Sequence, residues 1–211
     1  VGAGIVSSAA ITVGSVGYIS EFTSLSPVLL KIVVVLAVCA VACWGILESV
    51  VLAAAFTVIE VSGLIVIVIA GLVSDPGMIF RVNEVLPSVA DMPALVGIGS
   101  AALIAFFAFI GFEDMVNVAE ETVDPVRNMP RAIALTLFIT TFIYVCVVYV
   151  AVMSVPPAEL GVSDAPLAVV ADRVGGISPV VITGIAIMAT LNTIIIQIIM
   201  ASRVIYGVAN R

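Results

Sequence analysis

Long apolar runs, separated by glycine, proline and short polar stretches, dominate the chain. A helix needs about 20 apolar residues to cross the roughly 30 Å hydrocarbon core of a bilayer. Runs of about that length lie at residues 1–19, 28–47, 50–73, 94–112, 132–155 and 180–200. They are continuous, whereas membrane strands alternate in polarity and need only about 10 residues. The pattern therefore predicts an all-α integral membrane protein with six transmembrane helices.

The connections between the runs carry their own signals. The second and third runs are separated only around Glu48 and Ser49, which predicts an antiparallel helical hairpin. The connection before the last run contains a segment, 166–174, that is expected to form a short helix at the membrane interface with its charged residues on the polar side. Before the fifth run, an Asp-Pro step at 124–125 predicts a turn, and a helix is expected to begin near Pro130.

Composition excludes several classes of protein. Hydrophobic residues make up 63% of the chain and charged residues only 10%, against roughly 25% in a soluble domain. The net charge of 7 − 14 = −7 argues against binding to a nucleic-acid backbone. With no histidine, the chain has no Ser-His-Asp triad and no His-ligated metal, and Cys39, Cys43 and Cys146 lack zinc-site spacing. We therefore expect no soluble enzyme, no metal site and no cofactor apart from a coupling proton or sodium ion.

The basic residues indicate an orientation, because Lys and Arg are enriched on the cytoplasmic side of membrane proteins. With six spans, one side carries Arg127, Arg131, Arg203 and Arg211. The other side carries Arg81, Arg173 and Lys31. This small excess predicts that Arg127, Arg131 and Arg203 are cytoplasmic, and that Asp75 and Glu159 are outside.

One carboxylate lies deep inside a predicted span. Glu60 is 11 residues into the run at 50–73. Facing lipid, it would cost about 2.5–3.5 kcal/mol. It is therefore expected to face the protein interior, to be protonated or to contact a cation, and a packing role for a neutral, hydrogen-bonded glutamic acid is an equal alternative.

The run at 94–112 allows two interpretations. In the first, it is a complete span, and Glu113 and Asp114 mark the membrane interface. In the second, the helical pattern continues to residue 121, and about 42 Å of helix is too long for the bilayer core. A break near Gly111, within 109–112, would then give two half-helices whose freed backbone groups line a cavity, as in transporter substrate sites.

The last run carries a polar stripe. Thr183, Thr190, Thr193 and Gln197 share one helical face, and Asn192 lies beside it. Hydrogen bonding between helices explains such a stripe with no direct functional role and is the favoured interpretation.

Two segments have a familiar pattern. Residues 106–133 read F-F-A-F-I-G-F-E-D-M-V-N-V-A-E-E-T-V-D-P-V-R-N-M-P-R-A-I, and residues 202–211 read S-R-V-I-Y-G-V-A-N-R. Both resemble amino acid permeases of the amino acid–polyamine–organocation superfamily. The resemblance implies that the chain is a fragment covering roughly helices three to eight of a twelve-helix, inverted-repeat transporter of the LeuT type. It implies that the complete protein, in the plasma (inner) membrane, carries out secondary transport of amino acids or related amines by alternating access.

The resemblance also implies site residues. The unwound segment that meets the substrate would be flanked by Phe107, Ala108, Phe109, Ile110, Gly111 and Phe112. Glu60 falls near a position where many members of the superfamily carry a lysine that takes the place of a coupling sodium ion. Because the residue here is acidic, this lysine-based scheme of proton or sodium coupling does not carry over. Residues expected to take part in coupling or in a polar relay are Glu60, Glu113, Thr190, Asn192 and Thr193.

Two other functions compete with transport. A channel or passive pore would require rings of charge or carbonyl groups, and no repeated filter motif is present. An intramembrane enzyme would require a clustered nucleophile and base, which the sequence lacks. The expected partners are an amino acid or amine substrate, the lipid bilayer and the remaining helices of the transporter.

Overall fold

A computed structural model of the chain describes residues 2–20, 22–44, 46–86, 91–109, 122–163 and 165–209. The described residues form α-helices and short 3₁₀ helices and no strand, which confirms the all-helical prediction. In chain order the elements are α1 (Gly2–Ser20), α2 (Pro27–Trp44), α3 (Ile46–Ser74), η1 (Pro76–Phe80), η2 (Val82–Glu84), α4 (Met92–Ala105), η3 (Phe106–Phe109), α5 (Pro125–Ser154), α6 (Pro157–Val162), α7 (Pro166–Val174) and α8 (Pro179–Ala209).

Three described helices are long and apolar enough to cross a membrane. The qualifying segments are Val51–Ser74 of α3, Pro125–Ser154 of α5 and Pro179–Gly207 of α8. Shorter apolar helices occupy Gly4–Ser20, Pro27–Cys43 and Met92–Ala105. The structure thus supports an apolar helical membrane protein with three full-length candidate spans, while the predicted number of six spans stays a prediction.

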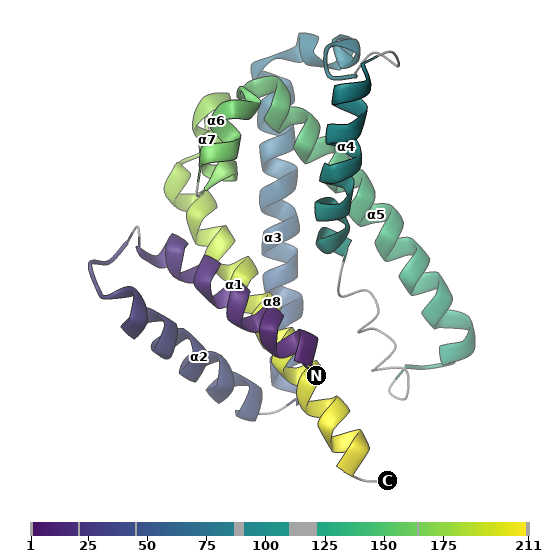
Figure 1. Ribbon diagram of the computed structural model, residues 1–211. Coiled ribbons are helices and arrows are strands. Elements are labelled where there is room, and N and C mark those ends of the chain that lie inside the picture. Colours follow the sequence, from purple (N-terminus) through teal and green to yellow (C-terminus); the bar gives the residue numbers. More distant parts are fainter. Residues whose placement is uncertain are drawn as a thin grey trace.

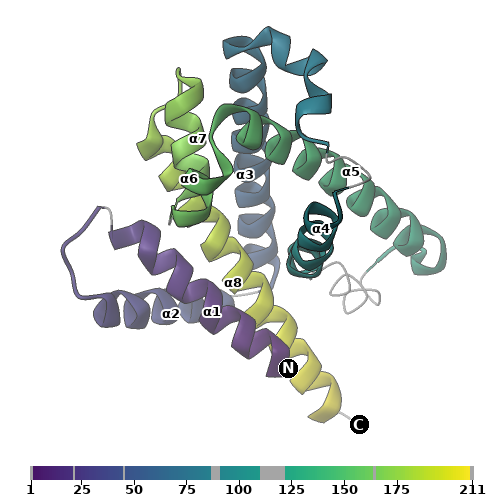
Figure 2. The same cartoon turned by 45° about the horizontal axis from the view of Figure 1, so that its top comes forward.

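The helices pack around two apolar cores, and α3 and α8 take part in both. One core joins α3, η1, α5, α7 and α8 around Ile67, Val150 and Val170. The other joins α1, α2 and α8 around Val16, Val34 and Ile194, with residues of α3 packed against it. Figure 1 shows α3 at the centre, α1 lying along α8, and α2 on the outer side of α1. In Figure 2, α4 stands near α5 and away from α1 and α2.

Two glycines allow α3 to approach its neighbours closely. A Cβ atom added at Gly63 would lie 2.8 Å from Cδ1 of Ile185 on α8. A Cβ added at Gly71 would overlap Cγ1 of Val150 on α5 and lie 3.3 Å from its Cγ2. Small residues at such crossings allow close packing where lipid supplies no hydrophobic driving force between helices.

Two predicted helix boundaries were wrong. Helix α2 ends at Trp44 and α3 begins at Ile46, so Glu48 and Ser49 lie inside α3 rather than in the connection. The start of a helix accepts an acidic residue because its macrodipole is positive there. Two polar residues are therefore no reason for the helix to stop.

Helix α5 begins at Pro125, five residues before the predicted start at Pro130. Asp124 precedes it with φ 48°, and Pro125 suits the first helical position, where the missing N–H would have no intrahelical partner. The Asn128 side chain donates a hydrogen bond to the carbonyl of Val123 at 2.6 Å and reinforces this start. Pro130 is tolerated inside the helix at the loss of one backbone hydrogen bond.

The connection between α5 and α8 contains the predicted short helix. Helix α7 has the predicted bounds, 166–174, and α6 precedes it. Val170, Ala171 and Val174 are buried, whereas Asp172 and Arg173 are exposed, as expected for an amphipathic segment. A guanidinium nitrogen of Arg173 donates to both carboxylate oxygens of Glu159 on α6, at 2.9 and 3.1 Å.

Candidate functional site

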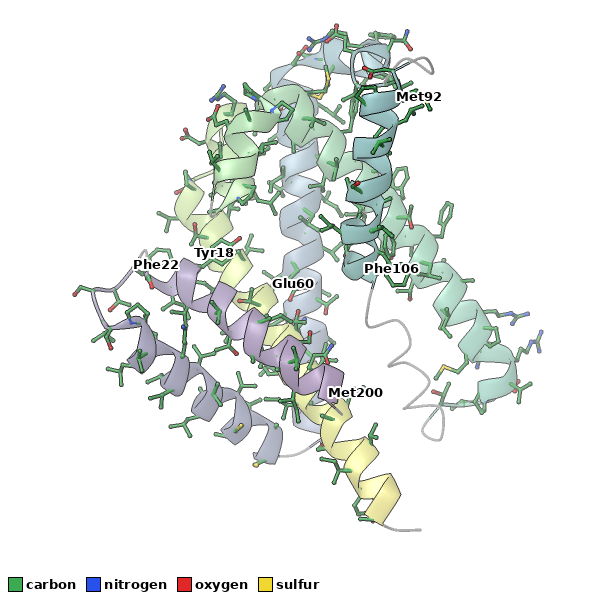
Figure 3. All side chains as sticks on the ribbon, viewed as in Figure 1. Tyr18, Phe22, Glu60, Met92, Phe106 and Met200 are labelled. Atoms are coloured by element: carbon green, nitrogen blue, oxygen red, sulfur yellow. The ribbon has the colours of Figure 1, made fainter. Side chains whose placement is uncertain are left out.

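A polar cluster joins α3 to α8 inside the apolar helices. The side-chain amide of Asn192 donates one hydrogen bond to Oε1 of Glu60, at 2.9 Å, and one to Oγ1 of Thr57, at 3.1 Å. Thr57 and Glu60 are three residues apart and therefore share a face of α3. In Figure 3, Glu60 lies on α3 close to the crossing with α8.

Burial differs sharply within this cluster. Asn192 is only 3% exposed, Glu60 is half-buried and Thr57 is more exposed. Oδ1 of Asn192 is buried and has no hydrogen-bond partner among the described residues. Such an amide is anchored through its two N–H groups.

The Glu60 carboxylate points toward Asn192 on α8. Among the described residues, ion pairs form at helix ends and in connections, between Arg81 and Asp75 or Glu84 and between Arg173 and Glu159, and none involves Glu60. A buried carboxylate without a cation is costly unless hydrogen bonds satisfy it or a proton neutralises it. The amide of Asn192 supplies one such hydrogen bond.

The candidate substrate segment begins where α4 changes character. The α-helix ends at Ala105, and the tighter 3₁₀ helix η3 follows over Phe106–Phe109, a change that often marks a hinge or a strained sequence. Phe107 and Ala108 lie within η3. The proposed break near Gly111, and with it Ile110, Phe112 and Glu113, lies outside the described residues.

Tyr144 on α5 holds this segment from the side. Its hydroxyl group donates to the backbone carbonyl of Ala108 at 3.1 Å, and its ring contacts Phe109 edge to face with centroids 5.5 Å apart. The two contacts tie η3 to a long candidate span. Figure 3 shows Phe106, where η3 begins, at the lower end of α4.

An apolar cavity of about 730 Å³ lies beside this contact. Its walls come from α3, α4, η3, α5 and α7, and they include Leu64, Ala108, Phe109 and Tyr144. Leu64 is one helical turn from Glu60, so the cavity wall and the polar cluster occupy neighbouring turns of α3.

The other predicted polar residues are not drawn into the cluster. Thr190 donates to the carbonyl of Ile187 and Thr193 to that of Ala189, both at 2.9 Å within α8. Thr183 is buried near the start of α8. A Cβ added at Gly4 of α1 would lie 3.1 Å from Oε1 of Gln197, which places Gln197 at the α1–α8 crossing.

Sequence reasoning missed two residues, Thr57 and Tyr144. Thr57 could have been found from its i, i+3 spacing to Glu60, since both must face the same neighbour. Tyr144 carried no such signal, because its partner is a backbone carbonyl 36 residues earlier in the chain. Among the described residues, no group of three His, Cys, Asp or Glu side chains could hold a metal ion.

The chain matches a protein-family model over nearly its whole length, and individual relatives match parts of it. A family model described as "Amino acid permease" matches residues 2–211. The branched-chain amino acid permease BcaP of Bacillus subtilis is 37% identical over 79 residues, which are 37% of this chain and 17% of that protein. The vacuolar cationic amino acid transporter 4 of Arabidopsis thaliana is 33% identical over 127 residues, 59% of this chain and 20% of that protein.

A third relative has a different substrate in its name. The methylthioribose transporter of Bacillus subtilis is 37% identical over 68 residues, 32% of this chain and 15% of that protein. Each of these three matches covers at most 20% of the relative's own length. All three relatives are named as permeases or transporters, and none as an enzyme.

Proposed function

The chain belongs to the amino acid permease family, and on this basis we propose that it forms part of a secondary active transporter for amino acids or related amines. The family is one of transporters and not of enzymes. The observation that carries the proposal is the family match over residues 2–211. The three long apolar helices support it, because they suit an integral membrane protein.

The proposed mechanism is alternating access around a mid-membrane site at the segment near Gly111. Residues 107–112 would present backbone groups to the substrate. The change from α-helix to 3₁₀ helix at Phe106 supports this site, because it begins just before that segment. The contacts of Tyr144 with Ala108 and Phe109 also support it, because they would hold one flank of the segment in place.

The proposed coupling element is Glu60 with Asn192. A mid-span carboxylate that receives an amide hydrogen bond and has no described cationic partner is suited to exchange a proton or to meet a sodium ion. Glu113, Thr190 and Thr193 remain weaker candidates for the polar relay. The hydroxyl groups of the two threonines bond within their own helix.

The proposed substrate class is broader than the substrate named for any one relative. The names of the relatives specify branched-chain amino acids, cationic amino acids and methylthioribose. Amino acids and related amines are the class that the family description supports.

The proposed membrane orientation follows the arginines. Figure 1 shows the start of α5 and the C-terminal end of α8 toward one end of the bundle and the end of α3 toward the other. The first end would carry Arg127, Arg131 and Arg203 on the cytoplasmic side of the plasma or inner membrane. The lipid bilayer and the remaining helices of a twelve-helix protein would be its partners.

Counterflow separates a carrier from a channel. The full-length protein is reconstituted in vesicles loaded with unlabelled amino acid, and uptake of labelled amino acid is followed. A carrier shows faster labelled uptake when substrate is present on the opposite side, because the loaded site returns faster than the empty one. If labelled uptake does not depend on substrate on the opposite side of the membrane, the protein behaves as a channel, which would contradict the proposal.

The coupling role is tested with Glu60→Gln in the same protein. The amide keeps the size of the side chain and cannot exchange a proton, so the pH dependence of uptake should flatten while substrate preference is unchanged. Ser62→Ala is the control on the same helix, because the Ser62 hydroxyl group is exposed and bonds to Val58. If Glu60→Gln keeps the parent's pH profile, Glu60 is only a packing residue.

A further inference from the structure

The polar cluster has a fixed direction of hydrogen bonding. The Thr57 hydroxyl group donates to the backbone carbonyl of Ala53, at 3.0 Å, one turn earlier in α3. Its single proton is then in use, and toward Asn192 the hydroxyl oxygen can only accept. The side of the Asn192 side chain that faces Thr57 must therefore be its NH₂ group.

The direction of the hydrogen bond to Thr57 decides which end of the Asn192 amide faces the Glu60 carboxylate. The NH₂ group of Asn192 has two N–H bonds, and the geometry directs one to Thr57 and the other to Oε1 of Glu60. If the amide turned over, its oxygen would face an ionised carboxylate, and both N–H bonds would occupy the buried position where Oδ1 now has no partner. Orphaned buried N–H groups are rarer in proteins than orphaned carbonyl groups.

We propose that Thr57 is a positioning residue that holds the Asn192 amide with an N–H bond directed at Glu60. The proposal rests on the proposed coupling role of Glu60, which it extends by one residue. Thr57 touches neither substrate nor ion in this account. It acts through Asn192, and it stabilises the ionised carboxylate because an amide N–H bond to a charged acceptor is stronger than one to a neutral acceptor.

No described titratable or charged side chain on the neighbouring elements bonds to Glu60. The main elements packed against α3 are α2, η1, α5, α7 and α8. Their described titratable or charged side chains are Lys31, Cys39, Cys43, Arg127, Arg131, Tyr144, Cys146, Tyr149, Asp172, Arg173 and Tyr206. None of these forms a hydrogen bond or ion pair with Glu60 among the described residues.

The experiment compares Thr57→Val with Thr57→Ser in the full-length protein in lipid vesicles. Valine keeps the branched shape and removes the hydroxyl group, whereas serine restores the hydroxyl group. A membrane-permeant carbodiimide, which reacts with the protonated carboxyl, labels Glu60 over a range of pH, and mass spectrometry measures the labelled fraction. Glu60→Gln gives the background, and Ser62→Ala is the matched control for a hydroxyl group on α3 that bonds only to its own helix.

In Thr57→Val the amide is no longer held, and its hydrogen bond to the carboxylate weakens. Half-maximal labelling should move to higher pH by about one pH unit, because the ionised carboxylate loses part of a hydrogen bond to a charged acceptor. Thr57→Ser and Ser62→Ala should label as the parent does. An unchanged profile in Thr57→Val, or an equal shift in Thr57→Ser, would overturn the proposal.

The pH profile of uptake separates this proposal from the coupling role. If labelling and uptake both shift in Thr57→Val, both proposals are supported. A shift in labelling with an unchanged uptake profile supports the positioning role and overturns the coupling role of Glu60. A shift in uptake alone overturns the positioning role, because the carboxyl group itself has not responded.

Discussion

The crossing of α3 and α5 depends on the absence of a side chain at Gly71. In Gly71→Ala, the new Cβ would overlap Cγ1 of Val150 and lie 3.3 Å from Cγ2 and 3.4 Å from Cβ of the same side chain. Favourable carbon–carbon contacts lie at about 3.5–4.0 Å. Val150 is 1% exposed and β-branched, so it has neither the space nor the rotamer freedom to move aside.

The expected change in stability is the difference between two effects. Alanine is better than glycine inside a helix by about 1 kcal/mol. Overpacking a filled site costs about 1–3 kcal/mol, and the overlap with Val150 favours the upper part of that range. Gly71→Ala should therefore lower the free energy of unfolding by about 1–2 kcal/mol.

Unfolding of the full-length protein in mixed detergent–lipid micelles measures this change. Gly14→Ala is the matched control, because no described atom lies within 4 Å of a Cβ at that position. The pair Gly71→Ala and Val150→Ala should be strongly non-additive, since the smaller side chain removes the overlap. If Gly71→Ala is as stable as Gly14→Ala, or if the two effects simply add, the helices do not cross as closely as described.

Further predictions concern the site, the topology and one connection. Gly111→Leu should abolish uptake by the full-length protein at a normal surface level, because a side chain would block the backbone approach, and full uptake would contradict the proposed site. A cysteine at position 127 should resist an impermeant reagent added outside intact cells, whereas one at position 75 should react, and the reverse pattern would invert the topology. Tyr149→Phe removes the hydrogen bond to the carbonyl of Met78, which measures 2.5 Å. A net loss of about 1 kcal/mol should make hydrogen exchange of the η1 amides about fivefold faster, and unchanged exchange would show that η1 does not depend on this bond.

The sequence predicted the helical class and several local features well. The long apolar runs lie in apolar helices, and the segment at 166–174 is helical with its charged residues exposed. These features depend on local periodicity, which can be read within one or two turns. Glu60 also faces a neighbouring helix, as its cost in lipid required.

The errors arose where local signals were weak or where distant segments meet. Glu48 and Ser49 looked like a connection, yet α3 begins before them. Pro130 looked like a helix start, yet Pro125 fits the first position better. The contact of Tyr144 with η3 brings together positions 36 residues apart, and no spacing rule within one helix could predict it.

The polar residues of α8 show which of them need a partner on another helix. Threonine can satisfy its hydroxyl group on a carbonyl of its own helix, one turn earlier, and Thr190 and Thr193 do so. An asparagine amide has two N–H bonds to satisfy, and a glutamate carboxyl group requires donors or a proton. Asn192 and Glu60 therefore meet across the α3–α8 crossing, although Asn192 lies beside the polar stripe and not on it. A stripe of threonines in an apolar helix is thus weaker evidence for a site than one carboxylate and one amide on facing helices.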